Sequence, residues 1–192
     1  MKNEDVSFSF FCAPITNRRP SATMTIADVY EYITSMQALE HTKKLREITD
    51  RDEARKYKCS HFDNVTFSGT FSYCADKNLI AHSSLLCIDF DHVGSHAELS
   101  ALREKLIADS NFVTQLLFVS PSGDGLKWVI SIDLTKCDHQ TWFLAVSNYV
   151  HATYGIDVDE QCRNVSRCCF LPHDSGCYVN PEILQSQDAC PF

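Results

Sequence analysis

The chain has 192 residues, of which 44% are hydrophobic and 22% are charged. This composition excludes a disordered chain, and the length is enough for one folded domain with a sizeable core. No apolar run is long enough to span a membrane, and the first residues lack the basic flank and long apolar stretch of a secretory signal. We therefore expect a cytoplasmic protein without a membrane partner.

The formal net charge is −8, which argues against a protein that coats nucleic acid with a uniformly basic surface. The charge is unevenly distributed, because residues 1–60 carry ten Lys or Arg and nine Asp or Glu, whereas the remaining residues carry seven and sixteen. The acidic excess therefore lies in the second part of the chain.

No internal repeat, low-complexity tract or Gly/Ser linker divides the sequence, so we expect a single domain over residues 1–192. A helical, locally basic part at about 25–58 precedes the part at about 60–180 that carries the motifs described below.

The first elements are predicted from apolar spacing. Alternating Val6, Phe8 and Phe10 predict a strand. The Thr25-x-x-Asp28 pattern is a capping box that predicts a helix over residues 25–38. Its buried face would consist of three apolar residues at helical spacing: Val29, Ile33 and Met36.

Basic residues dominate the next segment, which predicts one or two short exposed helices. The cations of this segment are Lys43, Lys44, Arg46, Arg51, Arg55, Lys56 and Lys58. They form either a solvated helix face or a patch that binds nucleic-acid phosphates.

Strands and helices alternate along the rest of the chain. Residues 65–71 predict a strand and turn, residues 85–90 a buried strand, and Ser95-x-x-Glu98 the start of a helix with apolar positions at Leu99, Leu102 and Leu106. Residues 115–120 and 126–134 predict an antiparallel hairpin, followed by a helix over 140–153 and a strand over 167–171. This order predicts an α+β fold in which helices flank a mixed sheet.

Ten cysteines raise the question of disulfides or metal. Without a secretory signal or a CxxC pair, we expect reduced thiols. A zinc site is the alternative, with ligands from the cluster Cys162, Cys168, Cys169, His173 and Cys177. A strand over 167–171 would oppose it, because Cys168 and Cys169 would then point to opposite faces.

Asp89 and Asp91 stand two residues apart at the end of the apolar strand 85–90. On a strand both side chains leave the same face, and two carboxylates so close together are stabilised by a shared divalent cation. The sequence therefore predicts an Mg²⁺ or Mn²⁺ site here. The alternative is that both carboxylates simply project into solvent.

Two further segments offer groups that bind phosphate. Ser120-Pro121-Ser122-Gly123-Asp124-Gly125-Leu126-Lys127 combines flexible glycines, hydroxyl donors and a lysine, although an ordinary hairpin turn explains the same letters. In the segment from Gly155 to Arg167, a carboxylate at Asp157 or Asp159 precedes an arginine. The carboxylate could be a metal ligand and the guanidinium a phosphate-binding group, or the two could form a structural ion pair.

The succession CIDFDH, SPSGDGLKWVI and GIDVDEQCRNVSRCCFLPHD resembles the VirE-type N-terminal domain found ahead of helicase modules in mobile-element replication proteins. That domain is similar to the primase-polymerase fold of the archaeo-eukaryotic primase superfamily. The resemblance covers most of residues 40–180 and implies a primase-polymerase-like sheet flanked by helices.

The resemblance also implies roles for individual residues. Asp89 and Asp91 match the DxD metal pair, and Asp159, with Asp157 as the alternative, matches the later metal aspartate. The nucleotide-binding residues implied are Ser120, Ser122, Gly123, Lys127 and Arg167. At Lys127 the superfamily usually has histidine. The lysine keeps a cation for phosphate, but this departure weakens the expectation of polymerase activity.

Three hypotheses follow. The first is a DNA replication domain with metal-dependent nucleotidyl transfer, which uses Mg²⁺ or Mn²⁺, a nucleoside triphosphate, a DNA template and a helicase partner or module. The second is a degenerate domain that binds nucleic acid or nucleotide without turnover, favoured by Lys127 and by the absence of a helicase module. The third is a phosphatase of the haloacid-dehalogenase type, whose nucleophile also lies in a DxD but in a parallel sheet.

Overall fold

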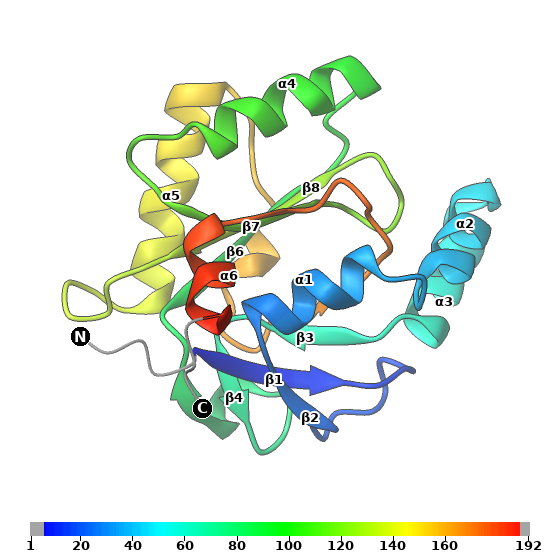
Figure 1. Ribbon diagram of the computed structural model, residues 1–192, viewed down its shortest axis with the longest axis horizontal. Helices are drawn as coiled ribbons and strands as arrows, with labels where there is room; N and C mark the ends of the chain where they lie inside the picture. Colours follow the sequence, from blue (N-terminus) through cyan, green and yellow to red (C-terminus); the bar gives the residue numbers. More distant parts are fainter. Residues whose placement is uncertain (1–5, 189–192) are drawn as a thin grey trace.

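The computed structural model describes residues 6–188, which form an α+β fold of antiparallel sheets and surrounding helices (Figure 1). The central sheet has the order β10-β7-β8-β6. Its strands are β6 (Leu85–Phe90), β7 (Thr114–Val119), β8 (Leu126–Ser131) and β10 (Tyr178–Val179). The hairpin predicted from the sequence is β7 and β8, and the predicted buried strand is β6, which pairs with β8 along its whole length.

Two helices cover one face of the central sheet: α4 (His96–Ile107) and α5 (His139–Tyr154). The capping box at Ser95 and Glu98 starts α4 as predicted, and Gly155, in the left-handed region at φ 68°, ends α5. Apolar side chains of both helices pack against every second residue of the strands, including Leu86, Ile88 and Trp128. This core fixes which face of β6 and β8 is left for the site.

A second core lies between the central sheet and a second sheet of order β2-β1-β3-β9. The strands of this second sheet are β1 (Ser7–Phe11), β2 (Ala22–Thr25), β3 (Asn64–Thr66) and β9 (Cys169–Phe170). Phe8 and Val65 of this sheet meet Leu116 and Val129 of the central sheet, with Val29 of α1 (Ile26–Thr34) alongside. The two sheets therefore bury their facing sides against each other.

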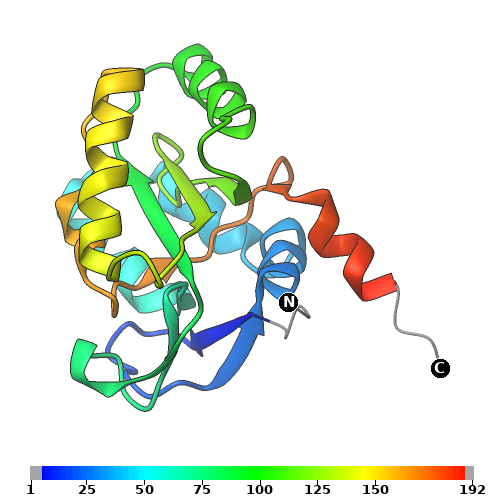
Figure 2. The same ribbon diagram turned by 90° about the vertical axis from the view of Figure 1, so that its left-hand side faces the viewer.

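The remaining elements lie at the edges. A short hairpin, β4 (Gly69–Phe71) and β5 (Leu79–His82), includes the turn η1 (Asp76–Asn78), and η2 (Glu160–Arg163) follows α5. The helices α2 (Leu39–Glu47) and α3 (Arg51–His61) pack as a pair at the edge of the molecule (Figure 1). Figure 2 shows α6 (Pro181–Asp188) on the side opposite α5.

The structure corrects the predicted helix 25–38. The helix keeps its capping box but ends at Thr34, because the hydroxyls of Thr34 and Ser35 donate to the carbonyls of Tyr30 and Tyr32. Met36, predicted to be buried on this helix, is 71% exposed. The predicted strand 167–171 is confirmed only over its central pair of residues, in β9.

Among the strands and α-helices of residues 6–188, four were not predicted: β2, β5, β10 and α6. Two of them, β2 and β5, are short and contain no buried residue, so they carry little of the apolar alternation by which a strand is found. Over residues 6–188, no helix combines the length and apolarity needed to cross a bilayer.

Candidate nucleotide and nucleic-acid site

The side chains of β6 alternate between the two faces of the central sheet, and this alternation determines the face on which Asp89 lies. Leu86, Ile88 and Phe90 of β6 face the core under α4 and α5, so Asp89 must face the other way. Its register partner across the β6–β8 ladder is Lys127, which shares that orientation. A carboxylate and an ammonium therefore meet at one point, near the end of the strand pair.

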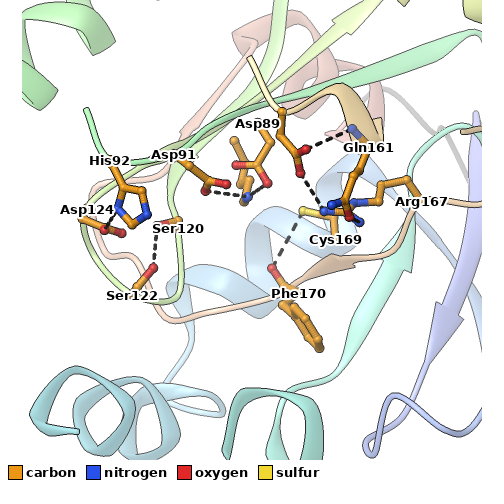
Figure 3. A network of polar contacts seen from close by, with 12 residues as sticks. Asp89, Asp91, His92, Ser120, Ser122, Asp124, Gln161, Arg167, Cys169 and Phe170 are labelled. Carbon is orange, nitrogen blue, oxygen red and sulfur yellow. Dashed lines mark hydrogen bonds and ion pairs between the residues drawn. The ribbon is translucent and has the colours of Figure 1, made fainter. Parts of the chain in front are cut away.

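Lys127 forms an ion pair with Asp89 and also lies beside Asp91 (Figure 3). Its Nζ contacts Oδ2 of Asp89 and is 4.0 Å from Oδ1 of Asp91. Asp89 and Lys127 are 7% and 9% exposed, whereas the Asp91 side chain is 56% exposed. The sequence predicted a divalent ion between the two aspartates, and the structure places the Lys127 ammonium beside both.

Arg167 holds Asp159 in a second ion pair. Its guanidinium donates to Oδ2 of Asp159 at 2.8 Å and to Oε1 of Gln161 at 2.7 Å (Figure 3). The main-chain nitrogen of Asp159 donates to the carbonyl of Asp89 at 3.2 Å, so the two acidic segments are joined directly. Asp157, the sequence alternative, points away to His151 and is 92% exposed. The structure therefore favours Asp159.

One group of side chains in the described part of the chain has the spacing of a metal site: Asp89, Asp159 and Cys162, whose ligand atoms lie within 4.8 Å of one another. Oδ1 of Asp89 is buried and has no hydrogen-bond partner. Burial raises the pKa of the Cys162 thiol to about 12, so this thiol is protonated at neutral pH. The donor set fits one Mg²⁺ or Mn²⁺ held by Asp89 and Asp159. Asp91 lies outside the group.

The segment from Ser120 to Gly125 is a closed hairpin turn. Ser120 N donates to the carbonyl of Gly125 and Gly123 N to that of Ser120, so these amides are not free to cradle phosphate. Gly125 is required because a Cβ there would lie 2.2 Å from the carbonyl oxygen of Phe90. Arg46 of α2 donates to the carbonyls of Ser120 and Pro121, which holds the turn against α2.

Within this turn, Oδ2 of Asp124 lies 2.6 Å from Nδ1 of His92, at hydrogen-bond distance (Figure 3). Burial raises the pKa of Asp124, hydrogen bonds from Ser122 and His92 lower it, and the net pKa is below the usual value. Asp124 is therefore an anion at the mouth of the site.

The paired residues open into a cleft of about 820 Å³. Of the predicted residues, Asp89, Asp91, Ser122, Lys127 and Arg167 line it. Ser120, Gly123 and Asp159 are absent from its lining, and Asp159 contacts two residues that do line it, Gln161 and Arg167. We call the group Asp89, Asp91, Lys127 and Arg167 the sheet wall.

Cations line the rest of the cleft. We call the group Arg46, Arg51, Arg55 and Lys58, which comes from α2 and α3, the helical wall. Arg18, from the loop before β2, adds another cation. In total, seven Lys or Arg and three Asp line the cleft, although the whole chain has a net charge of −8. The cleft is therefore a local region of positive charge that favours an anionic ligand.

The candidate zinc ligands in residues 162–177 do not meet. Cys168 faces Cys74, with 3.3 Å between the sulfur atoms, whereas Cys169 is buried in the core between the two sheets. His173 hydrogen-bonds to a main-chain carbonyl that follows α1. Cys168 precedes β9 and Cys169 begins it, and the two side chains go to different places. Of the five candidates, Cys162 alone belongs to a metal-spaced group within residues 6–188, and its partners there are Asp89 and Asp159.

Sequence reasoning missed Arg18, and it named Arg46 without its position in the cleft. Arg18 stands in a loop with no motif, and its side chain donates to the carbonyl of Cys74, far along the chain. Arg46 belongs to the basic segment, but only tertiary structure shows that it clamps the turn after Ser120 while Lys43 pairs with Glu40 outside the cleft. A basic residue on a helix carries no signal in the sequence for the surface that it faces.

Comparison with known proteins places the chain in a family. No curated protein and no solved structure gives a significant match. The family model described as "BT4734-like, N-terminal domain" matches residues 57–178, which is more than half of the chain and includes the sheet wall and the end of α3. The chain therefore belongs to the BT4734-like N-terminal domain family.

Proposed function

We propose that this chain is a primase-polymerase-type replication domain whose cleft binds a nucleoside triphosphate and a nucleic-acid strand for metal-dependent nucleotidyl transfer. The observation that carries the proposal is the charge of the cleft. Seven cations and three aspartates line it in an otherwise acidic protein, and phosphate is the anion for which arginine-rich surfaces are suited.

The acidic end of the cleft supports the choice of nucleotidyl transfer. Asp89 and Asp159 can hold one Mg²⁺ or Mn²⁺, which would neutralise the triphosphate and activate an attacking hydroxyl. The chain's own cations at this end, Lys127 and Arg167, form ion pairs with the two carboxylates and stand where phosphate oxygens would enter. The resemblance of the three motifs to VirE-type domains agrees with this choice and proposes a helicase as the partner.

Thermal unfolding with Mn²⁺ and a nucleoside triphosphate, separately and together, tests the proposal. A ligand that binds only the folded state raises its stability by linkage. The triphosphate should raise the unfolding midpoint of the wild type mainly when Mn²⁺ is present, and it should not do so in an Asp89→Asn/Asp91→Asn variant. Asp157→Asn, which removes a carboxylate outside the cleft, is the control and should behave as wild type.

A primer-extension assay with Mn²⁺ then decides turnover. Extension by the wild type and none by the Asp89→Asn/Asp91→Asn variant supports nucleotidyl transfer. If neither ligand moves the wild-type midpoint at saturating concentrations, the proposed nucleotide site is wrong.

The ion pairs of the sheet wall favour a second candidate, a module that binds nucleic acid or nucleotide without turnover. Lys127 already neutralises Asp89, and Arg167 already neutralises Asp159, so each predicted metal carboxylate has a cation. Binding of a single-stranded oligonucleotide without primer extension, even at high Mn²⁺, would support this candidate over the first.

The phosphatase hypothesis gains nothing from the fold. Its nucleophile belongs on a strand of a parallel sheet, whereas β6 is antiparallel to its partner β8. All strand pairs formed by residues 6–188 are antiparallel. Asp89 is moreover held by Lys127 rather than exposed for attack.

A further inference from the structure

A pair of thiols lies in the lining of the cleft, away from the carboxylates. Cys74, in the segment before η1, and Cys168, just before β9, have their sulfur atoms 3.3 Å apart. Both line the cleft, although Cys74 is only 4% exposed. The two residues are 94 positions apart in the sequence, so no spacing pattern could have paired them.

We propose that Cys74 and Cys168 form a reversible disulfide when a hydroperoxide enters the cleft, and that this thiol pair is an oxidative modification site. The inference does not depend on the proposed function, because it rests on the geometry of the two thiols alone.

The main chain around the two thiols is already held in place. The Cys74 thiol donates to the carbonyl of Ser166 at 3.4 Å, and Ser166 N donates to Asp76 at 3.1 Å. A disulfide needs the sulfur atoms to approach to about 2.05 Å, which is just over an ångström closer than they stand. Because the segments that carry them are joined by hydrogen bonds, this approach requires a local adjustment and no rearrangement of the fold.

The electrostatics of the pair assign the roles of attacking and resolving thiol. The hydrogen bond from Cys168 and the charge of Arg18 lower the pKa of Cys74 and outweigh its burial, which acts in the opposite direction. The same hydrogen bond, with burial, raises the pKa of Cys168. Cys74 is therefore the thiol of the pair that ionises more readily, and Arg18, which donates to its carbonyl, is the cation beside it.

The chemistry balances with hydrogen peroxide as the oxidant. The Cys74 thiolate attacks one peroxide oxygen, the O–O bond breaks, and the leaving hydroxide takes a proton to become water, which leaves a sulfenic acid on Cys74. The Cys168 sulfur then attacks the Cys74 sulfur, the S–O bond breaks, and the hydroxide leaves with the Cys168 proton as a second water. Two thiols lose two electrons in total, and a dithiol reductant reverses the change.

Peptide mapping of the full chain tests the proposal without any variant. The reduced protein is treated with equimolar hydrogen peroxide, its remaining thiols are alkylated, and a digest without reductant is analysed by mass spectrometry. We expect a linked peptide that joins Cys74 to Cys168 and disappears with dithiothreitol. Full alkylation of both cysteines, or a linkage between other cysteines such as Cys87 and Cys169, would overturn the proposal.

Single substitutions separate the two roles. Cys168→Ser should accumulate a sulfenic acid on Cys74 that a 1,3-dione reagent traps, because the resolving thiol is gone. Cys74→Ser should leave Cys168 fully alkylated. Cys12→Ser removes an exposed cysteine and is the control that should retain the disulfide. If oxidation of the wild type proceeds instead at Cys12 and spares Cys74, exposure rather than the thiol pair governs reactivity and the inference is wrong.

Discussion

The two walls of the cleft differ in how their cations are neutralised. On the sheet wall, Lys127 pairs with Asp89 and Arg167 with Asp159. On the helical wall, Arg51 and Arg55 are exposed, and residues 6–188 offer neither of them a carboxylate at ion-pair distance. Arginine is therefore held in an ion pair on the sheet wall, at Arg167, whereas Arg51 and Arg55 on the helical wall form no ion pair within residues 6–188.

This difference separates stability from binding. A buried ion pair is costly to break, because the remaining charge has no compensation, whereas an exposed cation contributes little to folding. The same exposed cation remains available to a phosphate, since no internal partner must be displaced. We therefore expect substitutions in the buried Asp89–Lys127 pair of the sheet wall to change unfolding and substitutions in the helical wall to change ligand affinity.

The largest effect is expected from Lys127→Met. This change leaves the Asp89 carboxylate buried without a partner and should lower the free energy of unfolding by about 3–5 kcal/mol, measured by urea denaturation. The double variant Asp89→Asn/Lys127→Met should recover most of the loss. Lys136→Met, which breaks the exposed pair with Asp133, should cost about 0–1 kcal/mol. Equal costs at Lys127 and Lys136 would contradict the expectation that the buried pair of the sheet wall is costlier to break than an exposed pair.

A buried histidine that lines the cleft should make folding sensitive to mild acid. Burial and the neighbouring His82 lower the pKa of His139 to about 4, from about 6.5 in an unfolded chain. Because the folded state resists protonation, its stability is complete above pH 6.5 and falls as the pH drops towards 4, by about 3 kcal/mol.

Urea unfolding of wild type and His139→Asn at pH 7 and pH 5 measures this dependence. The variant should lose less stability than the wild type between the two pH values. Identical pH profiles would show that His139 is not held neutral by the fold.

The next effect concerns the metal. At an Mn²⁺ concentration about 100 times Kd, a site at Asp89 and Asp159 should stabilise the fold by about 2.7 kcal/mol. Asp159→Asn should abolish this gain and Asp157→Asn should preserve it, as followed by the unfolding midpoint with and without Mn²⁺. Loss of the gain in Asp157→Asn alone would move the site to the other aspartate.

Much of the fold was predictable from the sequence because its signals are local. Continuous apolar runs identified β6, β7 and β8, and capping boxes located the starts of α1 and α4. The prediction for Met36 was wrong, because the apolar spacing continues beyond the end of α1. Two hydroxyls that donate to carbonyls of the preceding turn end the helix before Met36. Short edge strands such as β2 lack any periodic signal.

Part of the cleft lining was predictable from the sequence, and the pairing of its charges was not. Asp89, Lys127 and Arg167 were each identified, and the structure brings them to one cleft. Their assignment as metal ligands or phosphate contacts did not foresee that cross-strand register sets Lys127 against Asp89. Register depends on which strands become neighbours, which no single segment specifies.

Substitution of two adjacent residues of α3 should have the smallest effect on folding. It should also distinguish most clearly between cations that line the cleft and cations that do not. Arg55 lines the cleft and Lys56 does not, although both are exposed. Arg55→Glu should weaken binding of a single-stranded oligonucleotide by about 1.5 kcal/mol, roughly tenfold, and should reduce the salt dependence of log K by about 1. Lys56→Glu makes the same change in net charge outside the cleft.

Fluorescence anisotropy across a salt series compares the two variants, with urea unfolding to confirm that neither loses more than about 0.5 kcal/mol. Both substitutions reverse one charge on the same helix. A difference in oligonucleotide affinity between the two variants therefore reports the position of the charge and not the net charge. Equal losses of affinity would mean that the oligonucleotide senses only the overall field of α3. A loss confined to Arg55→Glu would place the strand inside the cleft, across from the paired charges of the sheet wall.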